Sequence, residues 1–130
     1  TSGSTTSGFT DSPYALLSLV NQASIEAIGR ICGAQIDPAR FRANIMIEGA
    51  EASAEYSWIG ARVRIGEAIG RVVAPIERCA ATNVNPADGQ VDLNIPLVLR
   101  RHFGSIKMGV FIQIDHPGLV KLTDRLILCQ

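Results

Sequence analysis

The sequence lacks closely spaced cysteines and long apolar runs. Its three cysteines, Cys32, Cys79 and Cys129, are an odd number and lie far apart, with no Cys-x-x-Cys pair. This spacing argues against a disulfide framework and against a structural zinc site. No apolar stretch approaches the length that spans a bilayer, so we expect no membrane span. A reducing, cytoplasmic setting fits such cysteines best.

An excess of one charge is also missing, because 12 Lys and Arg balance 12 Asp and Glu. A neutral chain has no overall field to attract nucleic acid, and we expect no nucleic-acid partner. His102 and His116 stand alone, without the spacing of metal ligands. The basic residues are ten Arg against two Lys, which favours planar recognition of carboxylate or phosphate. An arginine-rich genome would explain this bias as well.

The length of 130 residues predicts one domain with its own hydrophobic core. Residues 1–8 are rich in Ser, Thr and Gly and read as a flexible leader. The chain begins without Met, which suggests a processed or partial chain. We assign residues 9–130 to the folded domain.

Two short helices are predicted. In the first, Ser24 is the expected N-cap, Ile25, Ile28 and Ile31 face inward, and Gly33 ends the helix in a left-handed conformation. The second runs from an Asn N-cap at position 94 to position 102, with a Gly stop at 104.

Strand patterns fill most of the remaining chain. Strands are expected at residues 42–48, 61–73, 72–79, 109–115 and 119–128, with turns at 85–89 and 116–118. Between residues 61 and 73 apolar and basic residues alternate, and glycines at positions 66 and 70 predict a bulge or sharp coil. Many strands with two short helices predict a mainly β fold, a small β-barrel or sandwich.

Cys79 is the residue whose surroundings suggest chemistry. Its sulfur can bind a soft metal or carry a sulfur atom, whereas we expect Cys32 and Cys129 to be buried apolar residues. Neighbouring strand residues point to opposite faces, so Arg78 can activate Cys79 only at a strand end or bulge. Otherwise Arg42 would supply the positive charge.

Arg40 and Arg42 alternate with Phe41, so we expect both guanidinium groups on one face and Phe41 in the core. Two such groups repel unless an anion lies between them, and arginine can grip a phosphate with two hydrogen bonds. The alternative is a pair of exposed arginines matched by surface carboxylates such as Glu48 or Glu51.

An ordered series of segments resembles the MOSC domain family, the C-terminal domain type of molybdenum-cofactor sulfurases. The resemblance runs from about Phe9 to the end, and its segments are 40–49, Glu55, Trp58, 65–66, 78–79, Thr82, 85–86, Gly89, Gly109 and 116–118. It implies a β-barrel that handles the molybdenum cofactor (molybdopterin). The residue matching Cys79 carries persulfide sulfur or, in the amidoxime-reducing branch, ligates molybdenum, while the one matching Arg42 contacts the pterin phosphate.

The predicted site follows from this resemblance and from the arginine pattern. Cys79 is the predicted catalytic residue and metal ligand, and the predicted cofactor-binding residues are Arg42, Arg40, Arg78, Asn21, Ser24, Asn44, Thr82 and Phe111.

The chain departs from the family pattern in several places. Ala43 replaces the usual proline, Thr123-Asp124 replaces a Gly-Asp, and the amidoxime-reducing relatives tend to have tyrosine where Phe111 stands. The N-terminal β-domain that completes the cofactor site in those relatives is not in this sequence. We therefore expect the isolated domain to lack cofactor unless another chain, or the leader at residues 1–8, supplies the missing part of the anion-binding site.

Three functions remain open from the sequence. The first is a cofactor-binding or sulfur-carrying domain supplied by a donor such as a cysteine desulfurase. The second is a reductase of N-hydroxylated compounds with an electron-donor protein, and the third is a degenerate barrel that binds partners without catalysis. Pyridoxal phosphate is associated with the family through the desulfurase part of full-length sulfurases. The only lysines that could form a Schiff base with pyridoxal phosphate are Lys107 and Lys121, and both stand in turn-like or solvent-facing contexts.

Overall fold

The computed structural model describes residues 8–9, 16–121 and 124–129. In chain order the elements are β1 (Gly8–Phe9), β2 (Leu16–Asn21), α1 (Gln22–Cys32), η1 (a 3₁₀ helix, Pro38–Phe41), β3 (Ile45–Ile47), η2 (3₁₀, Ala54–Trp58), β4 (Arg62–Ile65), β5 (Ala68–Glu77), η3 (3₁₀, Ala80–Asn83), α2 (Ile95–Phe103), β6 (Lys107–His116), β7 (Leu119–Val120) and β8 (Leu126–Cys129).

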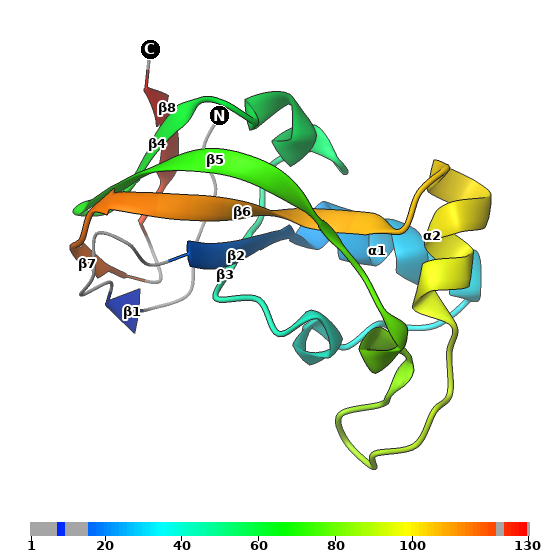
Figure 1. Cartoon of the computed structure of the whole chain (residues 1–130). Helices are drawn as coiled ribbons and strands as arrows, with labels where there is room; N and C mark the ends of the chain where they lie inside the picture. Colours follow the sequence, from blue (N-terminus) through cyan, green and yellow to red (C-terminus); the bar gives the residue numbers. More distant parts are fainter. Residues whose placement is uncertain (1–7, 10–15, 122–123, 130) are drawn as a thin grey trace.

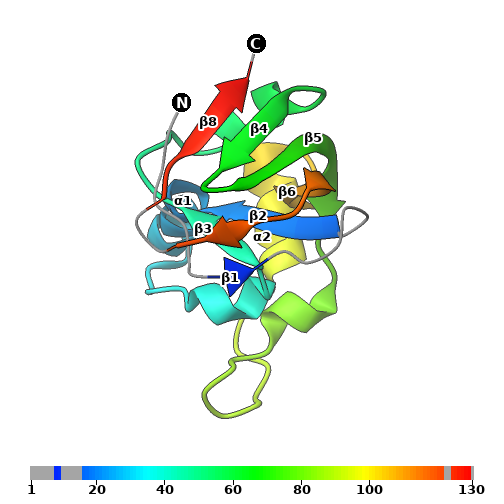
Figure 2. The ribbon, with the colours of Figure 1, turned by 90° about the vertical axis from the view of Figure 1, so that its left-hand side faces the viewer.

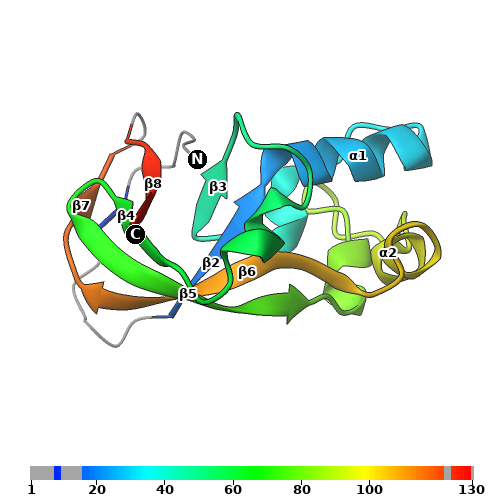
Figure 3. The same ribbon diagram turned by 90° about the horizontal axis from the view of Figure 1, so that it is seen from above.

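Six of the strands form one sheet, in the order β3-β2-β6-β5-β4-β8, and β1 pairs with β7 in a second, two-stranded sheet. Within the large sheet β2 and β3 are parallel, and the other neighbours are antiparallel. The large sheet curls into a half-barrel, with α1 and α2 at one end and β4, β7 and β8 at the other (Figures 1 and 3). The prediction of a mainly β, barrel-like fold with two short helices is confirmed.

The β4–β5 hairpin forms as the alternating pattern predicts. Val63 and Ile65 are buried, and Arg62 and Arg64 are exposed. The register of β5 against β6 shifts between Ile69 and Gly70, where a bulge was expected. A Cβ atom on Gly70 would lie 2.5 Å from the carbonyl oxygen of Gln113, so the close approach of the two strands requires glycine here.

The strand predicted at 109–115 forms as β6, but in place of the single strand predicted at 119–128 there are two short strands, β7 and β8. β6 pairs with β2 and β5, β7 with β1, and β8 with β4. After β6 the chain is hydrogen-bonded to the β4–β5 turn at Glu67. The N–H of Glu67 donates to the Leu119 carbonyl at 3.1 Å, and the Glu67 carboxylate accepts from the Leu119 N–H at 3.3 Å. Thr123 lies outside the described residues.

The predicted strand 42–48 is shorter than expected, because its first residues belong to a turn. Asp37 caps the 3₁₀ helix η1 by accepting from the Ala39 N–H, and Pro38 stands at the first position of the helix. Arg42 ends it in a left-handed conformation with φ of 49°. Three strand residues, β3, follow.

The first helix begins earlier than predicted. Asn21, not Ser24, is the N-cap, and its side chain accepts from the Ala23 N–H. Ile25 and Ile28 are buried as predicted, but Ile31 is 38% exposed because it lies near the free end of the helix. The predicted Gly33 stop is confirmed.

The second helix agrees with its predicted caps: Asn94 accepts from the Leu97 N–H, and Gly104 ends the helix in a left-handed conformation. None of the described helices is long and apolar enough to cross a membrane.

Two hydrophobic clusters lie on opposite sides of β2. Leu19 packs inside the half-barrel with residues of β4, β5 and β6. The next residue, Val20, packs against a second cluster under the helices, which includes Ile28, Phe41 and Leu99. Because Phe41 belongs to the second cluster, burial of its ring fixes where the Arg42 backbone lies.

Candidate functional site

Cys79 lies just beyond the end of a strand. β5 stops at Glu77; the next residue, Arg78, is 9% exposed, while Cys79 is exposed to solvent. A strand end is thus present where activation of Cys79 by Arg78 would need one, and the activation itself stays a prediction. Thr82 holds the turn that follows, since its hydroxyl donates to the Cys79 carbonyl at 2.8 Å and its N–H donates at 3.2 Å. Thr82 itself is buried.

The Arg78 side chain joins the Cys79 segment to the segment that carries Arg42. Its Nε donates to the Met108 carbonyl at 2.9 Å, and its Nη1 donates to the Phe41 carbonyl at 3.0 Å. The guanidinium carbon lies 5.3 Å from the centre of the Phe41 ring. Phe41 directly precedes Arg42, so one side chain ties two segments that lie 37 residues apart along the chain.

Burial leaves the Arg78 guanidinium only partly satisfied. Its Nη2 is buried without a hydrogen-bond partner. Burial lowers the pKa of Arg78, and the charges of Tyr56 and Cys79 oppose this shift. An unpartnered cationic N–H donor next to a cysteine could bind an anionic group of a ligand if a small displacement exposes it.

Gly109 gives the Arg78 side chain its space. The glycine has φ of 87°, a left-handed conformation that residues with a Cβ rarely adopt. A Cβ there would lie 2.7 Å from the Leu19 carbonyl oxygen and 3.2 Å from Arg78 Nη2. Gly109 is therefore required by the close packing of β2 and Arg78.

Arg40 and Arg42 do not share the environment that the sequence predicted. The 3₁₀ helix replaces the strand alternation, and Arg40 is buried while Arg42 is exposed. Arg40 Nη2 forms an ion pair with Asp92, with distances of 2.7 and 2.9 Å to the two carboxylate oxygens. The Arg40 guanidinium lowers the pKa of Asp92 through this hydrogen bond. The prediction of two guanidinium groups on one face is wrong, and the suggested partners Glu48 and Glu51 are not the ones found for Arg40.

Nothing in the sequence pattern marked Asp92 as the ion-pair partner of Arg40. It lies 52 residues from Arg40, in an irregular segment before α2. Arg40 also donates to the Thr82 carbonyl at 3.3 Å, and this hydrogen bond joins η1 to η3. A direct contact between Arg40 and a cofactor stays a prediction, and it would require this ion pair to open.

Asn44 and Phe111 converge on the face of the sheet opposite the barrel core. The Asn44 side-chain oxygen accepts from the Ser18 N–H at 2.8 Å. Ser18 lies opposite Phe111 on β6, and Phe111 lies opposite Ala74 on β5. Residues directly opposite each other project from the same face, and the neighbours of Phe111 in β6 are buried in the barrel core. The half-buried Phe111 and the exposed Asn44, whose side-chain oxygen also accepts from the Ser18 hydroxyl at 3.1 Å, therefore share this outer face.

Asn21 and Ser24 are held by a different segment. Asn21 Nδ2 donates to the Glu51 carbonyl at 2.6 Å and to the Glu55 carboxylate at 3.2 Å. Ser24 Oγ accepts from the Ser53 N–H at 2.9 Å. Both side chains organise the start of α1, and within the described residues neither bonds to the Cys79 segment. Their predicted role in cofactor binding stays a prediction.

Glu55 forms a buried acidic centre that sequence reasoning treated only as part of a family motif. It is fully buried, and its Oε2 has no hydrogen-bond partner. Burial raises the pKa of Glu55. Burial and then the charge of Glu55 raise the pKa of the neighbouring Tyr56 to about 12. A single acidic residue in a polar-looking segment carries no sequence signal that it will be buried.

A glutamine at position 55 should remove a pH dependence of stability. Because the pKa of Glu55 is raised above its ordinary value of 4.5, the folded state binds this proton more tightly than the unfolded state. The free energy of unfolding should therefore fall as the pH rises from 4.5 through the raised pKa, by about 1.4 kcal/mol for each unit in that window. Urea unfolding of wild type and Glu55→Gln at several pH values measures the difference. Parallel pH profiles would contradict this origin.

Metal coordination by the protein alone has little support. Among the described residues no group of three His, Cys, Asp or Glu side chains could hold a metal ion. A metal at Cys79 would therefore need to bring most of its own ligands, as the metal of an organic cofactor does.

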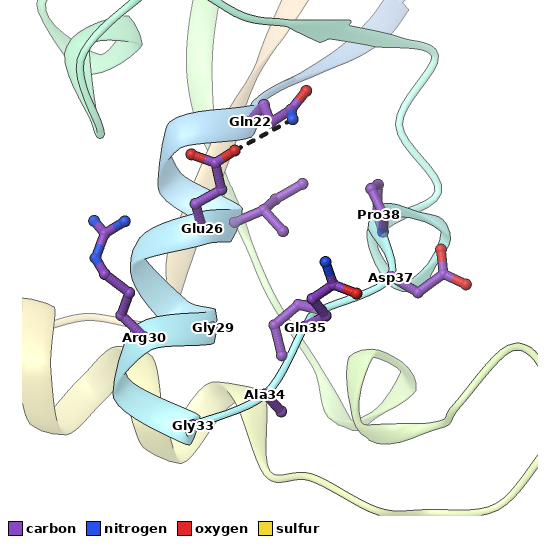
Figure 4. Close-up of a pocket in the computed structure, with 11 residues that line it drawn as sticks. Gln22, Glu26, Gly29, Arg30, Gly33, Ala34, Gln35, Asp37 and Pro38 are labelled. Atoms are coloured by element: carbon purple, nitrogen blue, oxygen red, sulfur yellow. Dashed lines mark hydrogen bonds between the residues drawn. The ribbon is translucent and has the colours of Figure 1, made fainter.

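A hollow of the described surface lies away from Cys79. It has a volume of about 950 Å³ and runs along α1 and the loop that follows it (Figure 4). Gln22, Glu26, Arg30, Gln35 and Asp37 line it. None of the predicted site residues is among its lining residues, so its size does not bear on the chemistry of Cys79.

Comparison with known proteins gives a consistent picture. The MOSC domain profile matches residues 7–127. Among curated proteins, mitochondrial amidoxime-reducing component 1 from Mus musculus is 28% identical over 125 residues, covering 87% of this chain and 35% of the relative, and the Xenopus laevis protein is 30% identical with the same coverage. The chain thus spans about a third of these relatives.

Two solved structures share the fold. YiiM from Geobacillus stearothermophilus superposes with a TM-score of 0.70 at 12% identity, covering 98% of this chain and 73% of that one. YiiM from Escherichia coli gives a TM-score of 0.66 at 20% identity, with coverage of 99% and 68%.

Proposed function

Because the chain belongs to the MOSC domain family, we propose that it binds the molybdenum cofactor or carries sulfur, with the Cys79 thiolate as the reacting group. One observation carries the proposal: the Arg78 side chain ties the exposed Cys79 to the Phe41–Arg42 peptide, so a thiol and an exposed guanidinium group belong to adjoining segments. The family's association with the molybdenum cofactor supports this choice of ligand.

The residues fit the cofactor in three respects. Cys79 offers a soft thiolate ligand, and the exposed Arg42 offers a guanidinium group for the phosphate. Phe111 and Asn44 offer an apolar surface and an amide on one face of the sheet. When bound, the cofactor would supply two-electron redox chemistry at its metal. The chain's own part would be to hold and orient it.

In the sulfur-carrier form of the proposal, the Cys79 thiolate attacks the terminal sulfur of a persulfide donor. A new S–S bond forms at Cys79, and the donor's S–S bond breaks to release its own thiolate. A cysteine desulfurase is the class of enzyme that presents such a persulfide. Incubation with a persulfide donor, followed by intact-protein mass spectrometry, should show one added sulfur atom on wild type.

A reductase of N-hydroxylated compounds is the second candidate. The name of the curated relatives, amidoxime-reducing component, favours it. It would need bound cofactor and an electron-donor protein, and turnover of an amidoxime by cofactor-loaded protein tests it. A buried, slowly reacting thiol would favour the third candidate, an inert barrel, and the exposed position of Cys79 argues against it.

Loss of the Arg42 guanidinium should weaken cofactor retention. We expect Arg42→Ala, expressed in a molybdenum-replete host, to retain about tenfold less pterin and metal than wild type, because a charge-assisted phosphate contact is lost. Arg30→Ala is the matched control, since Arg30 is also exposed but lies on α1. Equal retention by the two variants would contradict the assignment of Arg42.

A further inference from the structure

Three arginines gather on the outer face of the β4–β5 hairpin. Arg62 and Arg64 point outward from β4, because the alternate residues Val63 and Ile65 are buried. Arg71 of β5 lies directly opposite Arg62 in the antiparallel register. All three side chains are exposed.

Within the part of the chain that the structure describes, no ion pair balances the positive charges of these arginines. None of the three arginines forms an ion pair within the described residues, where the recorded pair is Arg40 with Asp92. Glu67, in the turn between the two strands, accepts with its carboxylate from the Leu119 N–H. Like charges directly opposite each other destabilise a sheet. Since the whole chain has zero net charge, this concentration of charge is local and calls for a reason outside the fold.

Exposed aliphatic side chains lie among the arginines. Val73 follows Arg71 along β5 and is 42% exposed, and Ile127 of β8 lies opposite Arg64 and is also 42% exposed. Together the five residues, Arg62, Arg64, Arg71, Val73 and Ile127, form what we call the arginine patch. Arginine next to apolar surface is characteristic of protein interfaces.

The arginine patch is accessible at one end of the molecule. β4, β8 and the first half of β5 lie at the end of the half-barrel that faces away from α1 and α2 (Figure 2). Arg71 lies in the first half of β5, whereas Cys79 follows the end of the same strand. A protein seated on the patch would therefore lie along the strand that leads to Cys79.

We propose that the arginine patch is a docking surface for a partner protein that presents carboxylates. Guanidinium groups match carboxylates with paired hydrogen bonds, and the aliphatic side chains suit a protein surface. Single-stranded nucleic acid would need aromatic side chains for base stacking, and the patch contains none. The inference stands whether or not the cofactor binds, because it rests on the outward face of β4, β5 and β8.

A defined carboxylate probe tests the patch. Binding of a fluorescein-labelled poly-glutamate peptide would be followed by fluorescence anisotropy at low and high salt. We expect saturable, salt-sensitive binding to wild type and about tenfold weaker binding to the triple variant Arg62→Gln, Arg64→Gln, Arg71→Gln. The matched control is Arg30→Gln, Arg100→Gln, Arg101→Gln, which removes the same charge from exposed helix positions and should bind as wild type does.

Three outcomes would overturn the proposal. These are absence of saturable peptide binding to wild type, equal loss in the two triple variants, and a patch-dependent preference for oligothymidylate or phosphatidylserine vesicles over the peptide. Melting temperatures provide a second readout. Relief of the Arg62–Arg71 repulsion should raise the melting temperature of the patch variant, whereas a fall below the control variant would mean that the arginines serve the fold.

Discussion

Cys79→Ser should reduce the metal and pterin retained by protein from a molybdenum-replete host by roughly 100-fold, because serine offers no thiolate at neutral pH. The same change should abolish the added sulfur atom after incubation with a persulfide donor. Metal analysis, pterin fluorescence and intact mass each measure one of these effects.

Cys129→Ser is the matched control for this prediction. Cys129 is exposed like Cys79, but it lies on β8, at the opposite end of the half-barrel from the helices. The prediction that Cys129 is a buried apolar residue is wrong, since β8 is an edge strand and turns this residue outward. Cys32 is partly buried and packs against the second hydrophobic cluster, the one under the helices, as an apolar residue would. Retention that falls equally in the Cys79 and Cys129 variants would show that exposed thiols contribute without specificity.

Arg78→Met should lower the free energy of unfolding by roughly 2–3 kcal/mol. The change leaves the buried carbonyls of Phe41 and Met108 without their donors, at about 1–3 kcal/mol each, and it removes the contact with the Phe41 ring. Relief of the guanidinium's desolvation, which lowers its pKa, offsets part of that loss. Urea unfolding measures the net effect.

A lysine at position 78 separates charge from geometry. Its ammonium group keeps the positive charge but lacks the fork that reaches both carbonyls, so Arg78→Lys should fall between wild type and Arg78→Met. Arg101→Met, an exposed change on α2, should stay within about 0.5 kcal/mol of wild type. Similar losses at positions 78 and 101 would mean that Arg78 does not join the two segments energetically.

Much of the fold was predictable because short-range patterns determine it. The alternation of Val63 and Ile65 with two arginines is enough to predict β4 and its buried face. Asn94 and Gly104 mark α2 because side-chain capping and left-handed glycine act within one turn of the helix. The resemblance to the MOSC family added the fold as a whole, and the shared architecture supports it.

The site was less predictable because its contacts join distant segments. A 3₁₀ helix capped by Asp37 separates Arg40 from Arg42, and Asp92 then claims Arg40. The N-cap of α1 is Asn21 and not the predicted Ser24. The Asn21 side chain also donates to Glu55, which is 34 residues away. Short-range patterns contain no information on such pairings.

By itself the sequence determined where most strands and helices form and that Cys79 follows directly on Arg78, because strand alternation, helix caps and covalent neighbours are local. Tertiary structure alone decided which arginine is buried and which is exposed. It also decided that Arg78 bonds to the Phe41 carbonyl, and that Arg62 faces Arg71 across the hairpin. These outcomes depend on desolvation and on strand register, which arise only when distant segments pack together.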